Sequence, residues 1–213
     1  MNRRNFFKAG LLSTLGVANH AMSNSGSLKF SPSTPNEIAG PFYPIIAQKD
    51  KDFDLTSIKG RKQEALGQKI IVHGIVLDTE GNPVEDATVD LWQANAAGRY
   101  SHPHDTNPAP VDENFQGWAI VPTGKSGEFR FNTVLPGIYP VGGGWSRPPH
   151  IHFKVTKKGY KELTTQMYFP DHALNQVDRL LQRKTKQEQA LMIAKKSTHK
   201  PDTYYYQIII EKV

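Results

Sequence analysis

Short segments of alternating polar and apolar residues, separated by turns rich in glycine and proline, constrain the fold of this chain most. Residues 69–77 and 87–93 alternate in this way, and DTEGNPVED between them has the composition of a turn. Because successive side chains of a strand point to opposite faces, each segment predicts a strand with one buried face. Further strands are expected at residues 127–134, 150–155, 164–169 and 203–213.

These strands follow one another without the strand–helix rhythm of parallel sheets. The chain is therefore expected to be mainly β, an antiparallel β-sandwich with long loops. Residues 173–196 are the exception, because apolar residues recur there at helical spacing and predict one or two surface helices before the last strand. The residues with this spacing are Leu174, Val177, Leu180 and Leu181, followed by Ala190, Ile193 and Ala194.

The first residues have the form of an export signal. Arg3 and Arg4 precede a mildly apolar run over residues 9–18, which is too short to cross a bilayer. RRNFFK resembles the twin-arginine motif, and the small residues around Met22 suit cleavage. We expect a signal peptide over 1–23, a Pro/Ser-rich linker over 24–37 and one domain over 38–213, in an exported, periplasmic or secreted protein. An amphipathic N-terminal helix is the alternative interpretation of the leader.

Charge and cysteine content narrow the classes of partner and site. The formal net charge is +6, and without the leader's Arg3, Arg4 and Lys8 the remainder carries 23 basic and 20 acidic residues. This balance gives no reason to expect nucleic acid as a partner. No segment after the leader is apolar enough to predict a membrane span. The chain has no cysteine, which excludes disulfides and thiolate ligands. A bound metal would need nitrogen and oxygen ligands.

The stretch RPPHIHF, residues 147–153, places two histidines on one face of a predicted strand. His150 and His152 are two residues apart, so their imidazoles project together and could hold a transition metal. A solvent-facing edge strand would explain the same spacing. His102 and His104 flank Pro103 and are expected in a loop. His20 lies in the leader, and His73, His172 and His199 are isolated and are expected to be structural or surface histidines.

Two tyrosines in predicted loops could complete a ligand set. Tyr100 follows a strand at a glycine-containing turn, and Tyr139 precedes His150 by eleven residues. A loop tyrosine is usually a half-buried packing residue. A trivalent cation can displace the phenol proton, however, and two phenolates with two imidazoles suit ferric iron better than zinc.

Several ordered motifs together resemble one family. GPFYP at residues 40–44, the strand–turn–strand of residues 74–100 ending in WQANAAGRY, PGIYP, RPPHIHF and TTQMYF are similar to motifs of the intradiol ring-cleaving catechol dioxygenases. The resemblance is strongest to the iron-binding chain of protocatechuate 3,4-dioxygenases. It runs from about Gly40 to the last residue.

The resemblance implies one non-haem Fe(III) per chain and the insertion of O2 between the two hydroxyl-bearing carbons of a protocatechuate-like catechol, giving a cis,cis-muconate-type diacid. Tyr139 would leave the metal when substrate binds and accept one of its protons. Arg147 and Gln166 match positions beside the substrate ring. The implied metal ligands are Tyr100, Tyr139, His150 and His152, and the expected substrate contacts are Gly40, Pro41, Tyr43 and Trp145.

The expected partners are the catechol and O2, within a homo-oligomer or together with a partner chain. The residues ahead of GPFYP do not predict the extra N-terminal helical segment of the catechol 1,2-dioxygenase branch, so a specialist for free catechol or hydroxyquinol of that type is not expected. Its glycine-rich connection YPVGGGWSRPPH also differs from the family's usual loop.

Two other functions stay open at this point. One is a histidine-rich metal enzyme, cupin-like or a hydrolase, that uses His102, His104, His150 and His152. The other is a non-catalytic, secreted β-sandwich binding module.

Overall fold

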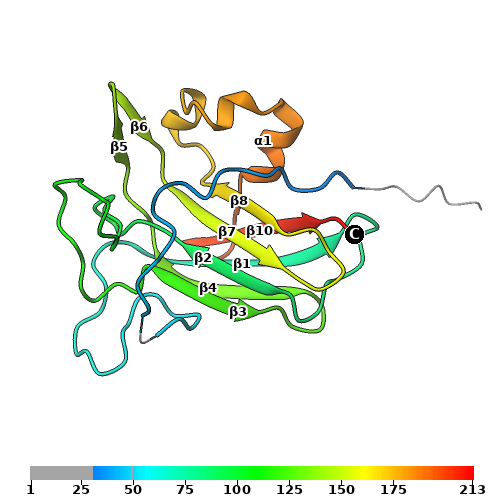
Figure 1. Cartoon of the computed structure of the whole chain (residues 1–213), viewed down its shortest axis with the longest axis horizontal. Helices are drawn as coiled ribbons and strands as arrows, with labels where there is room; N and C mark the ends of the chain where they lie inside the picture. The colour runs from blue at the N-terminus through cyan, green and yellow to red at the C-terminus, as the bar shows by residue number, and fades with distance from the viewer. Residues whose placement is uncertain (1–30, 49) are drawn as a thin grey trace, which may run out of the picture.

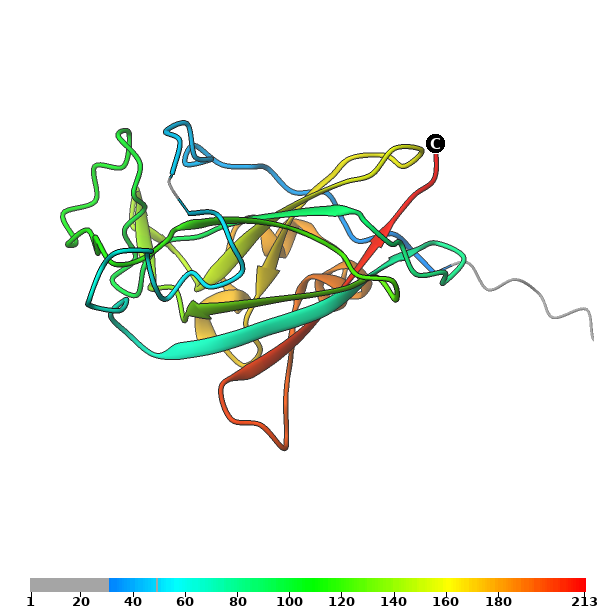
Figure 2. The ribbon, with the colours of Figure 1, turned by 90° about the horizontal axis from the view of Figure 1, so that it is seen from below.

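The computed structural model describes residues 31–48 and 50–213. Two four-stranded sheets pack face to face, as the ribbon in Figure 1 and its turned view in Figure 2 show. The mainly β sandwich with long loops is therefore confirmed. The predicted signal peptide and residues 24–30 of the predicted linker lie outside the described residues.

The first sheet has the order β4-β1-β10-β9 and the second β3-β2-β7-β8, while β5 and β6 form a separate hairpin. β10 runs parallel to β1, so the first sheet is mixed. The six predicted strands match observed ones to within three residues. β3, β5, β6 and β9 were not predicted. The bounds are β1 Lys69–Asp78, β2 Thr88–Trp92, β3 Trp118–Pro122, β4 Glu128–Val134, β5 Tyr139–Gly142, β6 Trp145–Arg147, β7 His150–Thr156, β8 Leu163–Tyr168, β9 Lys195–Lys196 and β10 Thr203–Ile210.

Alternation along the strands divides the second sheet into a core face and an outer face. In β7, Ile151, Phe153 and Val155 are fully buried in the core between the sheets. His150 and His152 alternate with them and project together from the outer face. These histidines are nevertheless only 2% exposed, so other segments cover the outer face.

The N-terminal segment is one of these covers. Residues 31–37 were expected to be part of a linker, but they pack against the sandwich. Thr34 is 1% exposed, and its backbone N–H donates to Ile209 O of β10. The Glu37 N–H donates to Thr164 O of β8. The segment thus pairs with backbone groups that the strands of both sheets leave free. The polar, proline- and serine-rich composition of the segment does not reveal this pairing.

GPFYP forms a turn at residues 41–42, although its two prolines predict an extended segment. Gly40 precedes this turn with a φ of +70°, a conformation that glycine tolerates.

The helical segment is more broken than the apolar spacing predicts. It contains two 3-10 helices, η1 (Ala173–Gln176) and η2 (Leu181–Arg183), and one α-helix, α1 (Lys186–Met192), which begins at a capping box between Thr185 and Glu188. Lys195 and Lys196, expected at a helix end, pair with β10 as β9. Val177 is 62% exposed, so its place in the apolar pattern was misleading. No helix among the described residues has the length and apolar character to span a membrane.

Candidate metal centre

Three strands of the second sheet place aromatic and polar side chains in one row on its outer face. Trp92 of β2 is the cross-strand partner of His152 of β7, and His152 is the partner of Gln166 of β8. One step along, His150 is the partner of Tyr168. Side chains on cross-strand partners of the same face lie side by side, which builds a rigid platform from three strands.

Tyr100 reaches this platform from the loop after β2, as predicted, whereas Tyr139 is the first residue of β5 and does not lie in a loop. The two segments are held closely together. The Gly137 N–H donates to Asn95 O, and the Tyr100 N–H donates to the buried Asp105 carboxylate at 2.7 Å. Gly98 lies against Ile138, the residue before β5: a Cβ added at residue 98 would stand 2.1 Å from Ile138 O. The Tyr100 loop and the start of β5 can therefore approach this closely because Gly98 has no side chain.

The four predicted ligands meet at one place. The ring centroids of His150 and His152 are 4.9 Å apart, and those of Tyr100 and Tyr139 are 5.6 Å apart. Tyr139 lies 5.6 Å from His150 between ring centroids. His152 Nε2 and the Tyr100 hydroxyl are 3.2 Å apart. All four side chains are buried, with Tyr139 the most exposed at 8%. The structure brings together the ligand set expected from the resemblance.

The donor atoms of this set fit a ferric ion. His150 Nδ1 donates to Pro148 O at 2.7 Å, which leaves Nε2 with its lone pair, and that atom is buried without a hydrogen-bond partner in the part of the chain that the structure describes. A backbone acceptor of this kind orients many metal-binding histidines. Burial lowers the pKa of His152 to about 3 and that of His150 well below its ordinary value, so both imidazoles are neutral and able to bind metal.

The tyrosines respond to burial in the opposite direction. Burial raises the pKa of Tyr139, and it raises that of Tyr100 well above its ordinary value, helped by the neighbouring Tyr139. Two buried phenols therefore stay protonated unless a strong positive charge replaces the protons. A trivalent ion supplies such a charge, and phenolate is a hard ligand that suits it.

Arg147 and Gln166 lie in a buried polar network beside the rings of the four predicted ligands, which are called the four rings below. Arg147 is 3% exposed, and its Nη2 donates to Gln166 Oε1 at 2.6 Å and to the Tyr168 hydroxyl at 2.9 Å. Gln166 Nε2 donates to Ile38 O of the N-terminal segment. Arg147 opposes the effect of burial on Tyr139 and keeps the pKa of that phenol from rising further. Both residues are therefore fixed next to the predicted ligands.

Three residues of this region were missed by sequence reasoning. Asp178 is fully buried and accepts from Arg147 Nε at 2.7 Å. Tyr168 stacks on His150 with centroids 6.0 Å apart, and Phe42 lies 4.8 Å from Tyr100 between centroids. Tyr168 could have been found, because it is two residues after Gln166 in a predicted strand and shares its face. Asp178 carried no such signal.

The expected substrate contacts fall in different places. A Cβ added at Gly40 would lie 3.6 Å from the His152 ring, so this backbone borders the centre. Pro41, the next residue, is exposed. Tyr43 packs edge-on against Trp92, while its hydroxyl donates to Asp90 and accepts from Lys154, so this hydroxyl is already engaged by the protein. Trp145 lies on β6 near Arg147, with 5.6 Å between its ring centroid and the guanidinium carbon.

The other histidines do not join this centre into a larger cluster. His102 and His104 lie near each other, with centroids 5.2 Å apart, in the loop after Tyr100. Within residues 31–48 and 50–213, no group of three or more His, Asp or Glu side chains is placed to hold a metal ion. The histidine-rich alternative is therefore not favoured.

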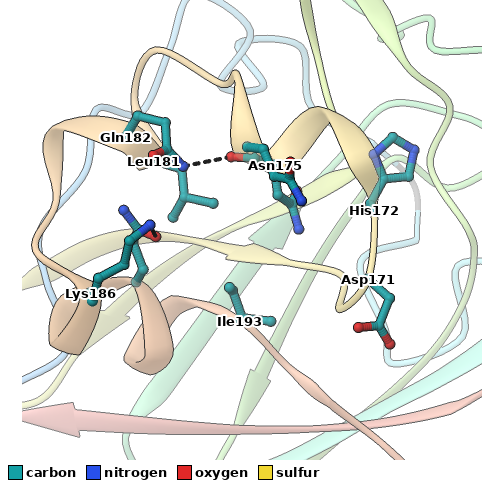
Figure 3. A pocket seen from close by; sticks show the side chains of 9 residues that line it. Asp171, His172, Asn175, Leu181, Gln182, Lys186 and Ile193 are labelled. Atoms are coloured by element: carbon teal, nitrogen blue, oxygen red, sulfur yellow. Dashed lines mark hydrogen bonds between the residues drawn. The ribbon is translucent and has the colours of Figure 1, made fainter.

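A polar cavity of about 700 Å³ lies elsewhere, between η1, η2 and α1. Figure 3 shows Asp171, His172 and Lys186 around it and the hydrogen bond from Gln182 Nε2 to Asn175 O. None of the four predicted ligands lines this cavity.

Comparison with known proteins agrees with the geometry. The family model described as Dioxygenase matches residues 38–211. The beta chain of protocatechuate 3,4-dioxygenase from Burkholderia cepacia is 40% identical over 168 residues, which cover 73% of this chain and 71% of that one. The chain belongs to the intradiol dioxygenase family.

Other intradiol dioxygenases are more distant or longer. Chlorocatechol 1,2-dioxygenase of Cupriavidus pinatubonensis is 34% identical over 64% of the present chain. The matched region covers only 54% of the length of the Cupriavidus protein. Among solved structures, 3-chlorocatechol 1,2-dioxygenase of Rhodococcus opacus matches with a TM-score of 0.63 and 26% identity, covering 88% of this chain and 75% of that one. The dioxygenase domain of a Streptomyces carbohydrate-binding fusion shares the fold, with a TM-score of 0.64 and 24% identity over 85% of this chain and 100% of that one.

Proposed function

We propose that this intradiol dioxygenase binds one non-haem Fe(III) through Tyr100, Tyr139, His150 and His152, and cleaves a protocatechuate-like catechol between its hydroxyl-bearing carbons. Both atoms of O2 would enter a cis,cis-muconate-type diacid. The observation that carries the proposal is the meeting of two buried phenols and two neutral imidazoles beside a buried arginine. The binding-module alternative gives no reason for this arrangement.

Ferric iron at this centre would act as a Lewis acid that binds the catechol diol as a dianion and makes its ring reactive towards O2. Within the protein, the Tyr139 hydroxyl oxygen is the atom that receives a substrate proton. Burial raises the pKa of Tyr139, so this oxygen holds a proton firmly once it has received one. Tyr100 and the two histidines stay in place to keep the substrate oriented.

Arg147 supplies fixed positive charge next to the reacting ring. Its Nε atom donates to Asp178 and its Nη2 atom donates to Gln166 and Tyr168, so Nη1 is the nitrogen that these three residues leave free. That nitrogen is therefore available to negative charge developing on the substrate. In a site closed to water, a preorganised donor of this kind stabilises a transition state strongly.

The charge around Trp145 supports a substrate with an anionic ring substituent. The guanidinium carbons of Arg147 and Arg179 lie 5.6 and 5.2 Å from the Trp145 ring centroid. Arg179 is exposed and has no carboxylate within 4.0 Å among the described residues. A carboxylate such as that of protocatechuate would complement this unpaired cation.

Assembly and location belong to the same proposal. The similarity to both the beta and the alpha chain of protocatechuate 3,4-dioxygenases supports a homo-oligomer or a complex with a partner chain. The leader supports export by the twin-arginine route. Light scattering of the purified protein tests the first point. Fractionation of cells that express wild type or a variant with Arg3→Lys and Arg4→Lys tests the second, because loss of the arginine pair should stop export.

The proposed function is tested by spectroscopy of the purified protein. A phenolate-to-Fe(III) absorption band is expected, with one iron per chain, and it should change when protocatechuate is added. Incubation with ¹⁸O2 should place both labelled atoms in a diacid product. Tyr139→Phe should alter the band, whereas Tyr206→Phe should not, because Tyr206 is a buried tyrosine of the sandwich core. A colourless protein that stays inactive after ferric reconstitution would overturn the proposal.

A further inference from the structure

Asp178 is a buried carboxylate in the segment between η1 and η2. It is 0% exposed and accepts hydrogen bonds at both oxygens. Oδ2 accepts from Arg147 Nε at 2.7 Å, and Oδ1 accepts from the Tyr168 hydroxyl at 3.1 Å and from the backbone N–H groups of Leu180 and Leu181 at 3.2 and 2.9 Å. The carboxylate thus joins the broken helical segment to the platform beneath the metal centre.

The same contacts fix which edge of the Arg147 guanidinium faces the centre. Asp178 occupies Nε, while Gln166 and Tyr168 occupy Nη2. Gln166 and Tyr168, both on β8, contact the same guanidinium nitrogen, Nη2. These contacts alone would leave the guanidinium plane free to turn about that nitrogen. The bond from Nε to Asp178 adds a second fixed point. Two anchored nitrogens define the guanidinium plane and direct Nη1 away from the network.

Charge explains why a carboxylate stands at this position. A buried guanidinium without a counter-ion is costly, and Asp178 is the carboxylate that forms a salt bridge with Arg147 among the described residues. An asparagine could still accept from the two backbone N–H groups, but it could not neutralise Arg147. The two tasks of Asp178, capping the turn and holding the arginine, can therefore be separated by substitution.

We infer that Asp178 is a positioning residue that holds the Arg147 guanidinium with Nη1 directed at the substrate, so that the segment between β8 and α1 contributes to catalysis. The inference rests on the proposed function for its catalytic consequence. The link between Asp178 and Arg147 does not depend on the proposed function and can be measured without iron or substrate.

The kinetic test uses Asp178→Asn in the iron-loaded protein with protocatechuate. We expect kcat to fall about 100-fold, because a misplaced catalytic group loses about that factor, while KM changes by less than about threefold. Iron content and the absorption band should match wild type, since the four ligands are untouched. Asp78→Asn is the control: Asp78 is also a buried, salt-bridged carboxylate that accepts backbone N–H groups, but it lies at the end of β1. Its kcat should stay within about twofold of wild type.

A double-variant cycle shows whether the effect passes through Arg147. Arg147→Gln alone should lower kcat strongly, and adding Asp178→Asn should then cost little more, because residues that act through one another are not additive. Full additivity of the two losses would overturn the inference. So would a kcat loss in Asp178→Asn no larger than that in Asp78→Asn.

The link itself is measured by NMR of the iron-free full chain. The Arg147 Nε–H resonance should exchange slowly with solvent in wild type and at least about tenfold faster in Asp178→Asn, because the buried acceptor is lost. Unchanged exchange would overturn the inference. Should Asp178→Asn fail to fold, Asp178→Glu replaces it, with the same kinetic cycle and the same resonance as readouts. A wild-type protein that binds no iron but shows the protected resonance would contradict the proposed function alone.

Discussion

Trp92 stacks on His152, with ring centroids 4.8 Å apart and planes within 9° of parallel. The two residues are cross-strand partners on the outer face of the second sheet. Tyr43 packs edge-on against the same indole, and Trp92 is only 1% exposed. Among residues 31–48 and 50–213, His152 has no hydrogen-bond partner at Nδ1, so the indole plane, in place of a polar acceptor, fixes the orientation of this imidazole.

Replacing Trp92 by alanine should therefore weaken both the fold and the metal centre. The loss of a fully buried indole should lower the free energy of unfolding by about 3–5 kcal/mol. Fe(III) affinity should fall by about 10- to 100-fold, the usual cost of losing a residue that orients a metal ligand. Urea unfolding and chelator competition measure the two effects.

Phe131→Ala separates the two effects of Trp92→Ala. Phe131 is 0% exposed in the core between the sheets, away from the four rings, so its loss should destabilise by a similar amount without changing the iron affinity of the folded protein. Wild-type iron affinity in Trp92→Ala would contradict the role given to the stacking.

Gly98 controls the approach of the Tyr100 loop to the start of β5, so Gly98→Ala should disturb the centre. Its φ is +79°, and an added Cβ would stand 2.1 Å from Ile138 O, which a loop can relieve only by moving Tyr139. We expect a weaker or shifted absorption band and at least about a tenfold loss of kcat. Gly81→Ala has a similar φ of +86° but open space around the Cβ, so it should cost only about 1 kcal/mol of stability and leave the band unchanged. Equal spectra for the two variants would contradict this role of Gly98.

The sequence predicts the parts of the centre that depend on strand alternation. His150 and His152 share a face because their strand has a period of two, and Gln166 follows from the same rule once the register of β7 and β8 is known. The register and the packing of loops on the outer face depend on contacts between distant parts of the chain. Residues 31–37 and Asp178 were therefore misjudged or missed.

Asp178 shows the physical reason for such misses. Its carboxylate accepts the N–H groups of Leu180 and Leu181, which competes with a continuous helix, so the apolar spacing around it predicted a longer helix than exists. Local periodicity does not reveal a side chain that bonds to the backbone and to an arginine 31 residues away.

Asp78 should govern part of the acid sensitivity of the fold. Burial alone would raise its pKa, but hydrogen bonds from Lys212 and Asn82 outweigh burial and lower it to about 2. Since the folded pKa lies below the unfolded value, the contribution of Asp78 is fully present above about pH 4 and is lost as the pH falls towards 2. Lys212 is about half exposed, so we expect about 1–2 kcal/mol after solvent screening.

Urea unfolding of wild type and Asp78→Asn at several pH values measures this contribution. The difference in stability between the two proteins should be largest at pH 5–6 and should shrink by about 1–2 kcal/mol near pH 2, because Asp78 is then protonated in the unfolded chain and about half protonated in the folded one. A difference that is constant from pH 6 to pH 2 would show that the Asp78 charge does not stabilise the fold.

Arg179 should distinguish carboxylated from neutral catechols. It is exposed, lies 5.2 Å from the Trp145 ring centroid and directly follows Asp178 in the chain. Arg179→Gln should raise KM for protocatechuate by about 3- to 10-fold, the range for a partly screened charge pair, and leave KM for unsubstituted catechol unchanged. The effect should shrink as salt is added, because an exposed pair is screened.

Arg183→Gln is the matched control for Arg179. Arg183 is also an exposed arginine of the helical segment, and no contact with Trp145 is found for it among the described residues. It should leave both KM values and their salt dependence unchanged. If Arg179→Gln raises KM for protocatechuate and catechol alike, Arg179 acts on the general shape of the site. If it changes neither, the ring substituent is recognised elsewhere. Steady-state kinetics of the three proteins with both substrates at two salt concentrations decide between these outcomes.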